Sequence, residues 1–83
     1  MNEVISVEAS FEPDGTIYPL TFLWQERRYR VTSLSRQWEH DGEHRFLVMT
    51  AEEQIFVLAY FPEERIWRLN RRPEDFRGPR KVV

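Results

Sequence analysis

Hydrophobic and polar residues alternate along most of this chain with a repeat of two, not the 3.6 of a helix. Residues 5–11 show the pattern most clearly, because Ile, Val, Ala and Phe alternate there with Ser and Glu, as in a strand that buries one face. Further runs of strand-forming residues follow at 20–24, 29–38, 45–50, 55–61 and 66–69. The pattern predicts an all-β fold of about six mostly antiparallel strands in meander order.

Turn-forming residues separate these runs. The Pro-Asp-Gly sequence at 13–15 predicts a turn, because Pro restricts φ, Asp bonds its own backbone and Gly accepts a positive φ. The Asp-Gly pair at 41–42 is the strongest two-residue hairpin signal in the chain. A further tight hairpin is expected at the polar residues 25–27, and the segments 51–54 and 62–65 join the later strands.

The second run predicts which residues face the core. Leu20, Phe22 and Trp24 are two residues apart, so we expect them to share the core face. Pro19 precedes them and is expected to start the strand, where its missing N–H costs least.

The core face changes parity within the third run. Tyr29 and Val31 are odd-numbered, whereas the next large apolar residues, Leu34 and Trp38, are even-numbered. A strand keeps one face to the core only if parity is kept, so the change predicts a β-bulge or a sharp bend near residues 32–34. Bends of this kind let a small sheet curl onto itself. We therefore expect a small barrel or a strongly bent sheet.

The composition indicates one small domain. The chain has 83 residues, of which 41% are hydrophobic and 14% aromatic, too many for a disordered chain and enough for a single core. We place the all-β domain at residues 1–72. A basic C-terminal extension follows at 73–83, and the acidic residues after Pro73 predict one short helical turn that reaches Arg77.

Two runs, 46–49 and 55–61, are apolar on both parities. Such runs are typical of central strands covered on both faces, or of a surface that awaits a partner. Pairing through that surface, or through an edge strand, would produce a homodimer or a docking module. Protein–protein contact or self-association is therefore the first functional hypothesis.

Acidic and basic residues are concentrated at opposite ends of the chain. The net charge of −2 has the wrong sign for a bulk electrostatic nucleic-acid binder. Residues 1–26 carry five acids and no base, whereas residues 65–83 carry seven bases against two acids. The two ends can face each other in the fold, or the basic end can contact phosphates or an acidic partner.

The second functional hypothesis is single-stranded nucleic-acid binding, in which bases stack on aromatic rings beside a basic track. The candidate residues come from the first hairpin and the C-terminal end, and are Arg27, Arg28, Tyr29, Arg30, Arg68, Arg71 and Arg72, with Trp38 and Trp67 beside them. A competing interpretation is that so small a domain needs its rings in the core, because each buries ~150–250 Å². It makes Trp24, Trp38 and Trp67 core residues.

Catalytic chemistry has few candidates. The absence of cysteine excludes a disulfide framework, thiolate zinc ligation and a Cys nucleophile. His40 and His44, within the acidic stretch 39–44, are the general-base candidates and could bind Zn²⁺ or Ni²⁺ if they sat opposite each other across the turn. No third ligand is assured, so we interpret the stretch as a solvated hairpin tip. Ser33 and Ser35 have no nucleophile elbow around them. We expect no enzyme activity, cofactor or metal.

Residues 22–31 resemble a hairpin pattern written F-x-W-x-G-R-x-Y-x-V. The likeness continues through Trp38 and the runs 46–50, 56–60 and 67–69, and covers residues 18–70. This order is similar to that of a family of small uncharacterised bacterial domains, and similar segments end some Y-family-like DNA polymerase homologues. The resemblance implies a bacterial domain with a link to DNA repair or replication, and it carries over no catalytic residue.

The chain departs from that family pattern at two turns. Glu26 or Arg27 stands where the family has Gly in the first hairpin, and Glu53-Gln54 replaces an Asp-Gly turn before the fifth strand. We therefore expect slightly looser loops at both places.

No apolar run approaches the 18 residues that span a bilayer, and the acidic, strand-like start of the chain is unlike a secretory signal. The sequence thus predicts a cytoplasmic, non-catalytic interaction module. Protein contact or self-association ranks first, and single-stranded nucleic-acid binding is the alternative.

Overall fold

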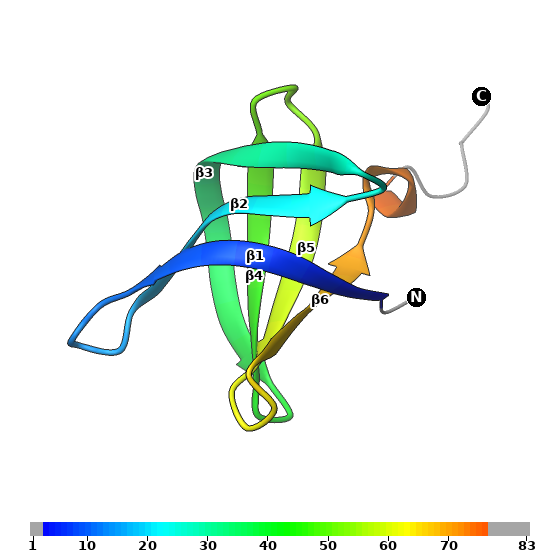
Figure 1. Cartoon of the computed structure of the whole chain (residues 1–83). Helices are drawn as coiled ribbons and strands as arrows, with labels where there is room; N and C mark the ends of the chain where they lie inside the picture. The colour runs from blue at the N-terminus through cyan, green and yellow to red at the C-terminus, as the bar shows by residue number, and fades with distance from the viewer. Residues whose placement is uncertain (1–2, 77–83) are drawn as a thin grey trace, which may run out of the picture.

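Six antiparallel strands close into a small barrel in the computed structural model, which describes residues 3–76 (Figure 1). The elements are β1 (Glu3–Phe11), β2 (Ile17–Trp24), β3 (Arg27–His40), β4 (Glu43–Thr50), β5 (Ile55–Phe61), β6 (Ile66–Arg71) and a 3₁₀ turn, η1 (Pro73–Phe76). Strands adjacent in sequence are adjacent in space, and β6 pairs with β1 to close the barrel. The predicted meander barrel and the short helical turn are confirmed, while Arg77 lies outside the described residues.

Two strands, β1 and β3, each pair with one neighbour along their first residues and with the other neighbour along the rest. The first four residues of β3 pair with β2, and residues 31–40 pair with β4. Likewise, residues 3–5 of β1 pair with β6, and residues 6–11 pair with β2. A strand that changes partners must bend, and β-bulges are the usual means.

Two bulges in β3 change which residues face outward. One lies between Val31 and Ser33, which confirms the break predicted near residues 32–34. A second bulge, at Ser35, restores the original parity. Trp38 therefore lies opposite Arg45 on the outer face instead of sharing the core with Leu34. The expectation that Trp38 is a core residue is wrong, because one extra residue turns every later side chain over.

A bulge in β2 exchanges the expected positions of Pro19 and Leu20. Glu8 pairs with Thr21 but Ala9 pairs with Pro19, which leaves Leu20 as the extra residue. Leu20 is 49% exposed and Pro19 is buried. The expectation that Leu20 faces the core, and that Pro19 starts the strand, is therefore wrong. A bulge accepts proline inside a strand because the ladder hydrogen bond is already interrupted there.

Aromatic rings fill the interior of the barrel. Phe22 stacks on Tyr29 with ring centroids 5.2 Å apart, and the edge of Phe56 meets Phe22 at 5.0 Å and Trp24 at 5.5 Å. Trp24 and Trp67 are each 7% exposed, as the core interpretation predicted for these two. A barrel of this size has room only for side chains.

The turn between β2 and β3 is as tight as a hairpin can be. Trp24 pairs directly with Arg27, so the loop is only Gln25 and Glu26, with φ values of 52° and 62°. Positive φ at both positions defines the type I′ geometry that Asn-Gly normally supplies. The expectation of a looser loop at this hairpin is wrong, because the backbone takes the same turn without glycine. The loop between β4 and β5, residues 51–54, places Glu53 at φ 63°.

We predict that Gln25→Asn combined with Glu26→Gly stabilises the protein. Non-glycine residues in the left-handed region cost ~1–2 kcal/mol each, part of which the added freedom of glycine in the unfolded chain offsets. A net gain of about 1 kcal/mol would raise the melting temperature by roughly 4–8 °C in a domain of this size. Thermal unfolding followed by circular dichroism measures it.

The matched control is Gly42→Ala in the Asp-Gly turn. Gly42 has φ +80°, and no atom lies within 4 Å of an added Cβ, so the backbone alone should lower the melting temperature. An unchanged or lowered melting temperature in the Gln25→Asn, Glu26→Gly variant would contradict the assigned turn geometry.

Candidate nucleic-acid interface

The outer face of β3–β6 gathers arginines into two neighbouring rows. Residues directly opposite each other in paired strands share a face, so the register identifies the rows. From β3 to β6, one row is Arg36, Leu47, Val57 and Arg71, and the next is Trp38, Arg45, Ala59 and Arg68. We call this surface the arginine face, defined by Arg36, Arg45, Arg68 and Arg71.

A bulge in β6 is what brings Arg71 to this face. Leu58 pairs with Leu69, but Val57 pairs with Arg71, so Asn70 is the extra residue. Without the bulge, Arg71 would have the parity of Leu69, which is buried in the core.

Three of the four arginines lie over aromatic rings. The pairs, with distances from guanidinium carbon to ring centroid, are Arg36 over Trp38 at 4.9 Å, Arg68 over Phe61 at 5.6 Å and Arg71 over Phe76 at 5.5 Å. Such stacking orders the planar guanidinium against the ring, and an arginine held in this way can donate N–H groups to phosphate or carboxylate. Within residues 3–76, neither Arg36 nor Arg71 forms an ion pair with a carboxylate.

Arg45, the fourth, is held by Glu43 on the same strand. Its Nη2 and Nε donate to Oε1 of Glu43 at 2.9 and 3.1 Å. Both side chains are only about one-fifth exposed, at 21% and 19%. The pair partly neutralises Arg45, so the positive charge available to a ligand comes mainly from Arg36 and Arg71.

The arginine side chains also cover the apolar residues of β5 that stand beside them in the two rows. Ala59 lies between Arg45 and Arg68 in its row and is 1% exposed, and Val57 lies between Leu47 and Arg71 and is 3% exposed. Long arginine stems cover apolar surface while their charged ends stay in water. The apolar patch that the runs 46–49 and 55–61 suggested is therefore largely covered on this side.

The η1 turn places Phe76 beside the arginine face. The backbone N–H of Arg72 donates to Oδ2 of Asp75 at 2.9 Å, and the N–H of Asp75 donates to the carbonyl of Arg72 at 2.9 Å. The first of these bonds, with the nearby Arg72 guanidinium, holds the pKa of Asp75 below its ordinary value. Arg72 is thus engaged by Asp75, while Arg71 extends over the ring of Phe76.

The predicted hairpin residues lie elsewhere on the barrel. Arg28 is 3.6 Å from Glu8, and Arg27 is 3.5 Å from Glu52, so both have carboxylate partners. Arg28 and Arg30 are on the part of β3 that pairs with β2, three strands away from β6. The structure therefore does not join them to Arg68 and Arg71 in one surface.

Tyr29 is a core residue and not a surface platform. It is 4% exposed, stacks on Phe22 and packs against Phe56 at 5.3 Å. Its ring is unavailable to a base, so Tyr29 is not part of the interface. Trp67 is buried in the core as well and is also not part of it.

Two arginines of the site were absent from the predicted set. The Asp-Gly turn could have identified Arg45, because a two-residue loop at 41–42 pairs Trp38 with Arg45. Arg36 follows from the same register, opposite Leu47. The place of Arg71 in one row with Arg36 depends on the bulge in β6, which has no signal in the sequence.

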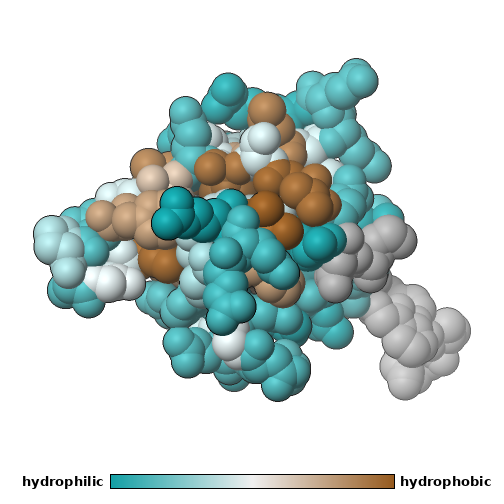
Figure 2. Space-filling view, turned by 60° about the horizontal axis from the view of Figure 1, so that its bottom comes forward, coloured by the Kyte–Doolittle hydropathy of each residue, from teal (hydrophilic) through white to brown (hydrophobic). Residues whose placement is uncertain are grey.

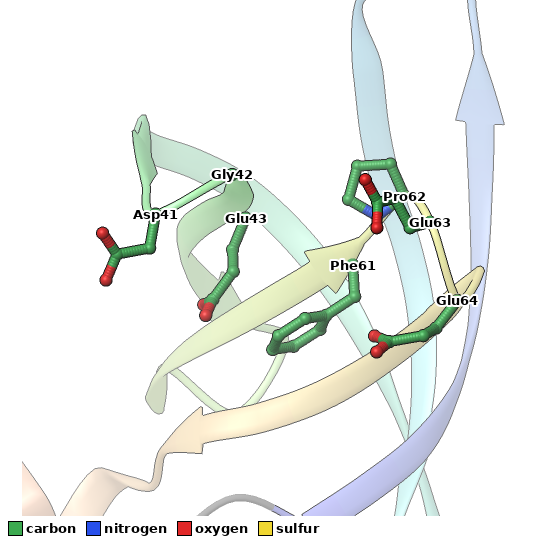
Figure 3. Close-up of a pocket in the computed structure, with 7 residues that line it drawn as sticks. All are labelled: Asp41, Gly42, Glu43, Phe61, Pro62, Glu63 and Glu64. Atoms are coloured by element: carbon green, nitrogen blue, oxygen red, sulfur yellow. The ribbon is translucent and has the colours of Figure 1, made fainter.

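A small pocket lies at the end of the barrel between the β3–β4 and β5–β6 turns (Figure 3). It has a volume of about 210 Å³, and its carboxylates are those of Asp41, Glu43, Glu63 and Glu64. Figure 3 shows the Phe61 ring between the side chains of Glu43 and Glu64. The negative charge here repels anions, so this pocket bounds the arginine face and does not extend it.

The two histidines do not face each other. His40 pairs with Glu43 and His44 with Glu39, and these successive pairs point to opposite faces of the ribbon. The condition for the metal hypothesis, two imidazoles opposite each other across the turn, is therefore not met. No group of three or more His, Asp or Glu side chains within the described part of the chain could hold a metal ion. Ser35 is the extra residue of a β3 bulge.

Among residues 3–76, no helix is long and apolar enough to cross a membrane. Comparison with protein-family models, curated proteins and solved structures finds no match for this chain. The residues of the arginine face are therefore the best indication of what this chain binds.

We predict that Asp75 controls the position of Phe76 in a pH-dependent way. Its folded-state pKa is lowered, so its contribution to η1 is present above the unfolded-state pKa and is lost as the pH falls through the folded-state pKa. Asp75→Asn should therefore release Phe76 from Arg71 at neutral pH, and the wild type should approach the variant in acid. NMR of the Arg72 amide and the Phe76 ring measures both.

Glu74→Gln, the neighbouring charge in η1, is the control and should leave the Arg72 amide signal in place. An Asp75 carboxyl that titrates at or above its ordinary pKa would contradict the assigned hydrogen bond.

Proposed function

We propose that this chain is a non-catalytic module that binds single-stranded nucleic acid on the arginine face. The observation that carries the proposal is the pairing of Arg36, Arg68 and Arg71 with aromatic rings on one outer surface of the barrel. Single strands are bound by aromatic and guanidinium planes that stack on bases, beside positive charge that follows the backbone.

The spacing of the arginines on this face favours a flexible polyanion as the ligand. Neighbouring strands are ~4.8 Å apart and successive outward residues of one strand ~7 Å apart, so the arginines are spread over a surface that one extended chain can cross. An unpaired strand can turn its bases toward Trp38 and Phe76 and its phosphates toward the guanidinium groups. A duplex keeps its bases stacked inside and would use only the charges.

Local charge, and not the net charge, supports the binding. The chain carries a net charge of −2, but Arg36 and Arg71 face solvent without carboxylate partners in the described residues. The acidic pocket lies at one end of the face, and its repulsion would orient the phosphate backbone away from the β3–β4 turn. Affinity should be modest and strongly dependent on salt.

This proposal reverses the order of the two functional hypotheses. The sequence ranked protein contact first because β4 and β5 are apolar on both faces. The burial of Val57 and Ala59 beneath arginine neighbours weakens that argument on this side of the barrel. A cytoplasmic role in DNA repair or replication, the setting implied by the resemblance to segments that end some polymerase homologues, is part of the proposal but does not carry it.

We predict that a fluorescent oligothymidylate binds the protein and that Arg36→Ala with Arg71→Ala weakens the binding. Each phosphate contact on a single strand contributes ~0.7 to the slope of log affinity against log salt, so losing two should lower the slope by about 1.4. Fluorescence anisotropy over a salt series measures both the affinity and this slope. Arg28→Ala is the matched control, because Arg28 is an exposed arginine on the other side of the barrel.

Tryptophan fluorescence locates the contact. Trp38 is partly exposed, whereas Trp24 and Trp67 are in the core, so quenching by the oligonucleotide should disappear in Trp38→Phe. Absence of binding at low salt would contradict the proposal, as would an equal loss of affinity in the Arg28→Ala control. Tighter binding of an acidic peptide than of the oligonucleotide would show that the face takes a protein partner.

A further inference from the structure

The exposed apolar side chains of the barrel are concentrated on β1 and β2. Three of them point outward from β2, and with their exposed fractions they are Tyr18 (45%), Leu20 (49%) and Leu23 (42%), whereas Val4 of β1 (57%) lies opposite Arg68 of β6 and is outside this group. In Figure 2, where the front of Figure 1 is turned upward, hydrophobic surface is gathered in the upper half and the lower half is mostly hydrophilic. We call this surface the β1–β2 face.

The β2 bulge is the reason that this face is apolar. It turns Leu20 outward beside Thr21, and the register then places Leu23 outward between Ser6 of β1 and Arg28 of β3. A shallow hollow lined by Ser6, Leu23 and Arg28, among others, lies over this crossing. Contiguous exposed apolar surface with a polar border is typical of a contact site.

The charges on this face are divided between its two borders. Glu8 lies on β1, and Arg28 and Arg30 lie on β3, with the apolar residues of β2 between them. Glu8 accepts a hydrogen bond from Thr21 at 2.7 Å and lies 3.6 Å from Arg28. Both charged side chains are well exposed, at 72% and 61%, so this pair is weak and is available to a second partner.

We propose that the β1–β2 face binds the same face of a second copy of this chain. A twofold axis parallel to β2 lays β1 of each copy over β3 of the other, so that Glu8 meets Arg28 and Arg30 of the second copy. Leu20 and Leu23, on β2 near the axis, meet their own equivalents. A surface that is acidic on one border and basic on the other matches itself under this rotation, as a closed isologous dimer requires.

This inference is independent of the proposed nucleic-acid site. In the barrel order, β4 and β5 lie opposite β1 and β2, and Figure 1 shows β1 and β2 in front of β4 and β5. The dimer therefore leaves the arginine face of each copy exposed, on opposite outer sides of the assembly.

The first test is sedimentation equilibrium of the full chain over a range of concentrations. The wild type should form a dimer whose dissociation constant increases at least tenfold in Leu23→Glu, because each copy then places a carboxylate beside the axis. Leu23 is exposed, so circular dichroism and the melting temperature should stay close to those of the wild type. Arg36→Ala with Arg71→Ala, on the opposite side, should dimerise as the wild type does.

A charge exchange provides the sharper test. Glu8→Arg alone and Arg28→Glu alone should each be monomeric, because like charges then face each other. An equal mixture of the two variants should form a heterodimer, since both cross-copy pairs are restored. A role for Glu8 and Arg28 only within one copy predicts no heterodimer, and that result overturns the proposal. A wild type that stays monomeric at high concentration, or a dimer that Leu23→Glu leaves unchanged, overturns it as well.

Discussion

Strand parity is the constraint on which both surfaces of this barrel depend. Closing six short strands requires bends, and the bends are made by single extra residues: Leu20 in β2, Thr32 and Ser35 in β3, and Asn70 in β6. Each bulge turns every later side chain of its strand to the other face. The positions of Leu20, Trp38 and Arg71 on the exterior therefore follow from the same geometric requirement that closes the barrel.

The interior and the arginine face are stabilised by linked contacts. Rings such as Phe22, Tyr29 and Phe56 fill the barrel, and β5 lies between them and the outer arginines. Because β5 is apolar on both faces, its outer residues need cover, and the stems of Arg45 and Arg68 lie on either side of Ala59. The arginines of this face therefore also shield the central strand.

The two proposed contact surfaces differ in chemistry and lie back to back. The arginine face offers stacked guanidinium groups to an anion, whereas the β1–β2 face offers apolar side chains between opposite charges. A dimer through the second face would present two arginine faces, and a long single strand that reached both would bind more tightly than one face alone allows. Self-association and nucleic-acid binding are therefore compatible in one molecule.

Local sequence by itself determined the six strands, the Asp-Gly hairpin and the first bulge of β3, because alternation and turn chemistry act between near neighbours. Only the tertiary structure decided where Leu20, Trp38 and Arg71 point. A bulge is a property of two paired strands, and its position depends on which register fills the core, so no single strand encodes it. For the same reason the sequence indicated that arginines and rings could form a site, but the assembled barrel selected which ones share a face.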